Sequence, residues 1–196
     1  RLARQFQERR IDKTYIARGQ AVARRGDLAV RAETLTARYR ETATEQPEIF
    51  KIEAVGGVVL VSPRERVEGA RGVYHVDRAM VKLTGKGLRF TSGEHVITAR
   101  DSLEYWDKRQ IAVARGKAVV SQGKQRLHAD ILTAYIAQTA AKGPTPAGAQ
   151  RINRVDAFGN VHVSVPNAII RGDKGEYYPG TSVATLSGNV KITSNK

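Results

Sequence analysis

The sequence predicts an all-β protein: an elongated, open, antiparallel structure built from repeated two-strand units. Three observations carry this prediction. Small and apolar residues alternate with polar ones at a period of two, the spacing of side chains that share one face of a strand. A glycine recurs six times in the apolar phase of that alternation, and in five copies a tyrosine follows it 18 to 20 residues later. No segment after Asp12 keeps the 3.6-residue period of an amphipathic helix.

The clearest unit is residues 111–135, IAVARGKAVVSQGKQRLHADILTAY. Its first strand places Ala112, Ala114, Gly116, Ala118 and Val120 on one face. A turn follows at residues 121–124, and a second strand runs through Leu127 and Ala129 to Tyr135. A single hairpin of this kind is marginally stable in water, so each unit must bury its apolar face against the next one.

The chain divides into a lead-in and six units. Residues 1–14 form a polar lead-in, helical or flexible over residues 1–12, and residues 15–196 form one domain. The units cover residues 15–39, 52–74, 81–105, 111–135, 155–177 and 184–192, and the sixth is cut short. Residues 138–150 are rich in proline and glycine and predict a loop. About twelve strands are expected, with open edges near residues 15–23 and 184–192.

The repeated glycines predict that every unit bends at the same level, because glycine inside a strand marks a bulge, a bend or close backbone approach. They are Gly19, Gly56, Gly85, Gly116, Gly159 and Gly188. Acidic residues also recur ahead of the tyrosines, at Glu33, Asp101, Asp130 and Asp173. A residue repeated in several structural units favours a structural role, so we expect strand-end hydrogen bonding rather than catalysis.

No residue pattern supports an enzyme. The chain has no cysteine, which excludes disulfides and thiolate chemistry. The histidines, His75, His95, His128 and His162, lack metal-site spacing and are expected at the surface. The SxxK match at residues 121–124 falls in a predicted hairpin turn rather than at the start of a helix. We therefore expect no catalytic residues, no metal and no cofactor.

The net charge of +14 is large for 196 residues and attracts polyanions. Nucleic-acid binding is not expected, because stacking platforms need exposed aromatics interleaved with basic residues and only 6% of the chain is aromatic. Many basic residues fall in turns and outward phases and are not expected to form one stripe; they include Arg18, Arg24, Arg25, Arg31, Arg38, Arg64, Arg66 and Arg71. A basic scaffold that binds a polyanion on its surface remains one alternative.

The predicted interior is thin, because alanine, glycine and valine fill less volume than the large residues of a usual sandwich core. Two arrangements follow from this: either the sheets approach closely, or the space holds an apolar ligand. An open apolar groove with a basic rim suits an amphiphile that carries acyl chains and phosphates, since each buried methylene contributes on the order of 0.8 kcal/mol.

The recurring pattern A-x-G-x-A/V-x-V, followed by L-x-A-D-x-L-x-x-Y, resembles the OstA-like repeat of the LptA family of lipopolysaccharide-transport proteins. It is clearest in ARGQAVARRGDLAVRAETLTARY, ARGKAVVSQGKQRLHADILTAY and AFGNVHVSV. The resemblance covers nearly everything from Tyr15 to Ile192. It implies a periplasmic β-jellyroll that holds the acyl chains of lipid A, performs no reaction, and joins other jellyrolls head to tail through edge strands.

The resemblance also implies partners, whereas the candidate site residues are a hypothesis drawn from the alternation and are not carried over from the family. The partners are lipopolysaccharide, LptC-like and LptD-like jellyrolls, and a second copy of the chain; an LptC-like protein or an LptD N-terminal jellyroll remains an alternative identity. The bulkier residues of the glycine phase form the expected acyl-chain wall: Val58, Leu60, Val81, Leu83, Phe90, Ala118, Val120, Val161, Val163 and Val190. The expected edge-strand residues are Tyr15, Ala17, Gly19, Ala21, Leu186, Gly188, Val190 and Ile192.

Overall fold

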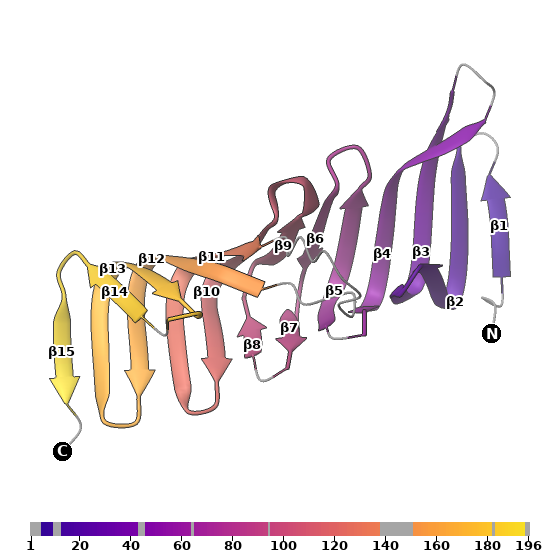
Figure 1. The fold of residues 1–196 in the computed structure, drawn as a ribbon. Helices are drawn as coiled ribbons and strands as arrows, with labels where there is room; N and C mark the ends of the chain where they lie inside the picture. Colours follow the sequence, from indigo (N-terminus) through magenta and orange to yellow (C-terminus); the bar gives the residue numbers. More distant parts are fainter. Residues whose placement is uncertain are drawn as a thin grey trace.

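The computed structural model describes residues 5–9, 13–42, 46–63, 65–93, 95–137, 151–181 and 183–194. The described chain forms one antiparallel sheet of 15 strands, wound into an elongated body with its termini at opposite ends (Figure 1). The predicted all-β, antiparallel class is confirmed. The strands are β1 (Gln5–Arg9), β2 (Thr14–Arg25), β3 (Leu28–Glu41), β4 (Pro47–Val61), β5 (Glu65–His75), β6 (Met80–Thr84), β7 (Arg89–Ser92), β8 (His95–Thr98), β9 (Ser102–Trp106), β10 (Ile111–Gln122), β11 (Gln125–Ala137), β12 (Arg151–Val165), β13 (Ala168–Tyr178), β14 (Val183–Ser187) and β15 (Lys191–Ser194).

The only helix in the described part is a 3₁₀ turn, η2 (Asp107–Arg109). Within those same residues, no helix is long and apolar enough to cross a membrane. The predicted loop at residues 138–150 lies outside the described residues.

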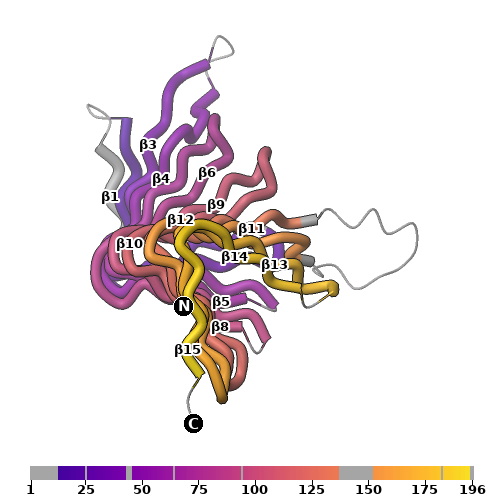
Figure 2. The backbone as a smooth tube through the Cα atoms, turned by 90° about the vertical axis from the view of Figure 1, so that its left-hand side faces the viewer, coloured from indigo at the N-terminus to yellow at the C-terminus, as the bar shows by residue number. Residues whose placement is uncertain are grey.

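Each long strand contributes to two layers. In β10, residues 111–115 pair with β9, whereas residues 119–122 pair with β8. In β13, residues 174–178 pair with β14 and residues 168–171 with β15. The first layer therefore runs laterally from β1 to β14, and the second from residues 21–25 of β2 to β15. Seen along the body, the two layers diverge from a common bend (Figure 2).

The bend lies at the six repeated glycines, as the sequence predicts. All six have φ between 73° and 90°, in the left-handed region that is unfavourable for residues with a Cβ atom. The strand register shifts beside them, for example between Phe158 and Val161 around Gly159. A Cβ atom on Gly159 would lie 2.5 Å from Oδ2 of Asp130 on β11. Glycine is thus required here both for its backbone angle and for the close approach of the neighbouring strand.

The recurring acidic residues also lie at the bend: Glu33, Asp130 and Asp173 are inside strands rather than at the expected strand ends, whereas Asp101 directly precedes β9 as expected. Asp130 and Asp173 accept hydrogen bonds from the side-chain amides of Asn160 (2.8 Å) and Asn189 (2.9 Å). Both asparagines follow a bend glycine and have φ of 48°, a conformation that asparagine tolerates better than most residues. The predicted structural role is supported: Asp130 and Asp173 hold the bend in place by hydrogen bonds, and the strands that carry them continue on both sides of it.

Two strand predictions need correction. Residues 5–9 form β1, paired with residues 14–18 of β2, instead of a helical or flexible segment. The strand count is 15 rather than about twelve, because the bend interrupts three passes of the chain completely and splits them into β6 and β7, β8 and β9, and β14 and β15. When each split pass is counted once, twelve passes remain.

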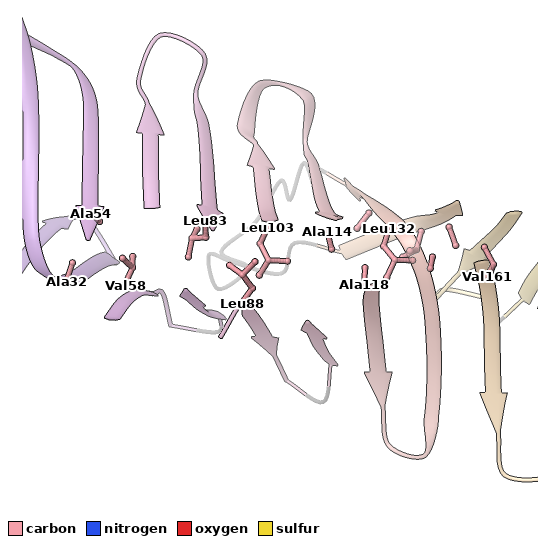
Figure 3. Packing of buried hydrophobic residues seen from close by; sticks show 14 of the residues in the cluster. Ala32, Ala54, Val58, Leu83, Leu88, Leu103, Ala114, Ala118, Leu132 and Val161 are labelled. Carbon is pink, nitrogen blue, oxygen red and sulfur yellow. The ribbon is translucent and has the colours of Figure 1, made fainter. Parts of the chain in front are cut away.

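The core is a single apolar line along the bend (Figure 3). Half of its sixteen buried members are alanine, and its largest fully buried side chains are Leu83, Val58 and Val161. Small side chains let the two layers meet closely at the bend, where packing of this kind supplies most of the stability.

Candidate functional site: an open apolar trough

On β4, β6 and β10, burial of the interior side chains falls with distance from the bend. Val58 is 1% exposed, whereas Leu60, two residues further along β4, is only partly buried. The same step separates Ala118 from Val120 on β10, and Leu83 from Val81 on β6. The interior is therefore a dry core at the bend and an accessible apolar wall where the layers diverge. The two layers thus meet closely at the bend, and their inner faces beyond it, which carry these partly buried apolar side chains, are called the trough.

The structure separates the predicted wall residues into three groups. Val58, Leu83, Ala118 and Val161 are buried in the core line. Leu60, Val81, Phe90 and Val120 are partly buried against it, and Val163 is also partly buried. Val190 is 47% exposed and lies between β14 and β15, away from the trough wall. The second group, together with Val163, leaves apolar surface partly accessible on the inner faces of the two layers.

Sequence reasoning missed the interior residues of the second strand of each unit. On β11 the interior positions are Leu127, Ala129, Leu132 and Ala134, so the alternation changes phase by one residue at Asp130. On β3 the same change separates Ala32 from Leu35. The repeated L-x-A-D-x-L sequence carries this signal, because two apolar residues three apart interrupt a period of two.

One carboxyl group belongs to the interior phase. Glu65 begins β5 and alternates with Val67, which packs against the core line. Burial raises the pKa of the Glu65 carboxyl above its ordinary value. The trough thus has an acidic position near the turns of the second layer, where burial makes the carboxyl harder to ionise than an exposed one.

The outward face of the first layer carries several ion pairs. Glu104, on β9, is buried and accepts contacts from Lys82 Nζ (3.2 Å), Arg115 Nε (3.4 Å) and Ser102 Oγ (3.1 Å). Burial raises the pKa of the Glu104 carboxyl, but hydrogen bonding and charge from Lys82, with the charge of Arg115, outweigh burial and leave that pKa below its ordinary value. Arg154 similarly lies 2.8 Å from Asp156 and stacks over the Tyr135 ring at 4.4 Å.

The outward face of the second layer carries basic residues with little acidic compensation, but the predicted arginines are spread over both layers and do not form one stripe, as expected. Strand register aligns Arg24 and Arg66 in one lateral row and places Arg31 in the adjacent row. Arg18, Arg38 and Arg71 belong to first-layer segments instead. Arg64 and the side chain of Arg25 lie outside the described residues. Of the ten salt bridges between described residues, only Arg66–Glu68 lies on this face.

Two histidines form a pair that the sequence did not predict. His128 and His162 face each other across β11 and β12, with ring centroids 4.1 Å apart and planes 12° from parallel. Burial lowers the pKa of His128, and the charges of His162 and Arg126 lower it further. Among the described residues, no cluster of three or more histidine, aspartate or glutamate side chains could hold a metal ion.

A shallow pocket of about 370 Å³ lies at the loop tips of the first layer, apart from the trough. Arg78, Trp106, Lys108 and Arg109 line it, and Arg109 stacks over the Trp106 ring at 5.3 Å. Lys108 Nζ donates to the backbone oxygen of Asp77 at 3.0 Å. The pocket is open and three of its four lining residues are cationic, so it does not extend the apolar wall.

The predicted edge residues fall on both ends of the sheet. Tyr15 and Ala17 lie on the part of β2 that β1 covers, whereas Ala21 lies where β2 pairs only with β3 among the described strands. At the other end, Leu186 is on β14, Gly188 is at the bend and Ile192 is on β15. Ile192 is 71% and Val183 52% exposed. Exposed apolar side chains on an edge strand favour pairing with another chain.

A family model for the LptA/(LptD N-terminal domain) LPS transport protein matches this chain twice, over residues 2–101 and 97–196. A comparison with curated protein sequences gives no significant match. Among solved structures, the chain is similar to LptH from Pseudomonas aeruginosa, described as the LptA-homologous periplasmic component of a lipopolysaccharide transport device. The two are 14% identical with a TM-score of 0.46, and the match covers 70% of this chain and 94% of LptH.

Proposed function

Because this chain belongs to the LptA/LptD N-terminal domain family of lipopolysaccharide transport proteins, we propose that it carries lipopolysaccharide across the periplasm with the lipid A acyl chains in its trough. The family consists of transport proteins and not of enzymes. The observation that carries the proposal is the accessible apolar wall beyond the buried bend, formed by residues such as Leu60, Val81 and Val120. That wall continues from β2 to β14.

The acyl chains would cover surface that the folded protein leaves partly exposed. Each methylene transferred from water to this wall contributes on the order of 0.8 kcal/mol. The residues in direct contact are then Leu60, Val81, Phe90, Val120 and Val163. Val58, Leu83, Ala118 and Val161 support the wall from behind, because they are already buried.

Site-specific photocrosslinking tests this proposal with a matched pair of neighbours. A photoreactive residue at Leu60 faces the trough, and the same residue at Val59 faces outward on the same strand. We expect lipopolysaccharide adducts from Leu60 and Val120 and none from Val59. Equal labelling of Leu60 and Val59 would reject the trough as the acyl-chain site.

We further propose that the chain assembles head to tail with related jellyrolls. The exposed β14 and β15 edges of one copy would pair with the β1 edge and residues 21–25 of β2 in the next. An LptC-like or LptD-like jellyroll with the same edges would be accepted in the same way, since strand addition is driven largely by main-chain hydrogen bonds.

Cysteine crosslinking tests the assembly cleanly, because the chain has no cysteine of its own. A chain carrying Arg24→Cys, on the β2 edge, mixed with one carrying Thr193→Cys, on β15 and on the same face of the sheet, should form a disulfide-linked dimer under mild oxidation. The pair Arg24→Cys and Ser164→Cys, with the second residue on the same face of an interior strand of the sheet, is the control. Crosslinking of the control to the same extent would contradict edge pairing.

A further inference from the structure

The outward face of the second layer is organised by strand register into two parallel rows of residues. One row reads, strand by strand, Val22, Arg31, Val59, Glu68, Arg89, Thr98, Val119, His128, His162, Arg171 and Lys191. The other reads Arg24, Ala29, Val61, Arg66, Thr91, Val96, Ser121, Arg126, Ser164, Ile169 and Thr193. Residues distant in sequence thus become lateral neighbours, which composition alone does not reveal.

The half of these rows from β7 to β15 contains no acidic residue. Its cations are Arg89, Arg126, Arg171 and Lys191, all exposed, and the stacked His128–His162 pair lies between them. None of the four cations forms an ion pair with another described residue. We call these six residues the basic strip. Seven strands at about 4.8 Å spacing make it roughly 30 Å long.

We propose that the basic strip binds the phosphate headgroups of an anionic phospholipid membrane surface. Long, exposed cations gain Coulomb energy beside such a surface without burying apolar groups. This binding site is separate from the trough, whose wall lies on the opposite face of the same strands. The proposal therefore goes beyond carriage of the acyl chains.

The residues around the cations favour a lipid surface over other polyanions. They are Val96, Thr98, Val119, Ser121, Ser164, Ile169 and Thr193. A protein partner usually needs aromatic or large apolar anchors in well-packed pockets, and this set provides neither. Single-stranded nucleic acid is bound on exposed Phe, Tyr or Trp stacking platforms, and the two rows contain none of these residues. A fluid array of phosphates requires only positive charge spread over an area.

The histidine pair makes this attraction depend on pH. The charged groups that flank it are Arg126 on β11 and Arg171 on β13, while β10 contributes the uncharged Val119. In the free protein, burial and neighbouring positive charge lower the pKa of His128 and so oppose its protonation. Phosphates lying on the strip would offset that charge, so acidification strengthens membrane binding.

Vesicle flotation of the full chain tests the proposal. Phosphatidylcholine vesicles with about 30% phosphatidylglycerol are compared with pure phosphatidylcholine vesicles at low salt. Each cation near an anionic surface contributes about fivefold in affinity. The combined variant Arg89→Gln, Arg126→Gln, Arg171→Gln and Lys191→Gln should therefore lose affinity by a factor of several hundred. Raising the salt to about 0.3 M should release the native chain, because it screens exposed charges.

The matched control removes the same charge from elsewhere: Arg71→Gln, Lys86→Gln, Lys117→Gln and Lys174→Gln, four exposed cations of the first layer and the bend. It should lose less than tenfold. Equal loss in both variants, or no binding by the native chain, would overturn the proposal. Tighter binding to soluble polyglutamate than to the anionic vesicles would also overturn it, in favour of an acidic protein partner. The variant His128→Gln, His162→Gln should bind equally at pH 5.5 and pH 8, whereas the native chain binds more tightly at pH 5.5.

Discussion

The side-chain amide of Asn160 donates a 2.8 Å hydrogen bond to Oδ2 of Asp130, joining β12 to β11 at the bend. Asn189 and Asp173 repeat the contact between the segment after β14 and β13, at 2.9 Å. In each pair the asparagine follows a bend glycine and the aspartate lies against that glycine. The bend is therefore held by side chains as well as by glycine geometry.

Replacing a bend glycine should destabilise the fold more than replacing a turn glycine. Gly159→Ala combines a φ of 75° with a Cβ position 2.5 Å from Asp130, and we expect it to lower the free energy of unfolding by about 2–4 kcal/mol. Gly123→Ala has a φ of 56° and no atom within 4 Å of the new Cβ, so about 1 kcal/mol is expected. Urea denaturation measures both. Equal losses would show that the contact with Asp130 is unimportant.

A carboxylate introduced into the interior should have different effects in the buried core and on the partly exposed wall, and so distinguish the two. Val58→Asp buries an unpaired carboxyl in the core line and should cost at least about 3 kcal/mol of stability. Leu60→Asp lies on the partly exposed wall, so it should leave the chain folded while abolishing lipopolysaccharide crosslinking from Val120. Circular dichroism and crosslinking yield are the measurements, with Val59→Asp as the outward control. Retained crosslinking in folded Leu60→Asp would contradict the assignment of the wall.

Glu104→Gln should lower the free energy of unfolding at pH 7 and leave it nearly unchanged in acid. The pKa of Glu104 in the folded chain lies below the unfolded value of 4.5, so its contribution is complete above that value and lost as the pH falls through the folded pKa. We expect a loss of about 1–2 kcal/mol at pH 7, measured by urea denaturation. Glu48→Gln removes a half-exposed partner of Arg40 and should cost less than about 1 kcal/mol. A pH-independent loss in Glu104→Gln would exclude its charge as the cause.

Glu65→Gln should have the opposite effect. Burial raises the pKa of Glu65 in the folded chain, so the ionised group weakens the fold once the pH exceeds that value. The variant should melt at a higher temperature than the native chain at pH 7, and the difference should vanish below about pH 4.5, where the group is protonated in both states. Thermal unfolding at the two pH values measures this. A lower melting temperature at pH 7 would mean that the Glu65 carboxylate makes a stabilising contact.

The glycine repeat and the two-residue alternation predict the architecture because each reports directly on the backbone. Gly116 and Gly159 indicate where strands bend, and Ala112 to Val120 indicate which face is interior. At Asp130 and Glu33 the alternation shifts by one residue, so counting every second residue along these strands gives the wrong face beyond that point. Leu132 and Leu35 therefore required the structure to be recognised as core residues.

The alternation within one strand also cannot predict which residues of adjacent strands become lateral neighbours, and the reason is different. Pairing of His128 with His162, or of Arg171 with Lys191, depends on the register between strands, and register is set jointly by all the turns and bulges. An edge strand such as β1 is also hard to predict, because a short polar segment carries little alternation. Its pairing with residues 14–18 of β2 is a tertiary effect.

The bend also determines what can vary in this architecture. Each unit carries its own glycine and contacts its sheet neighbours, so no closing contact between the two ends limits the number of units. One more two-strand unit would lengthen the trough by about 10 Å without altering its cross-section. The cross-section is thus encoded within each unit, and the length of the body is set by how many units follow one another along the chain.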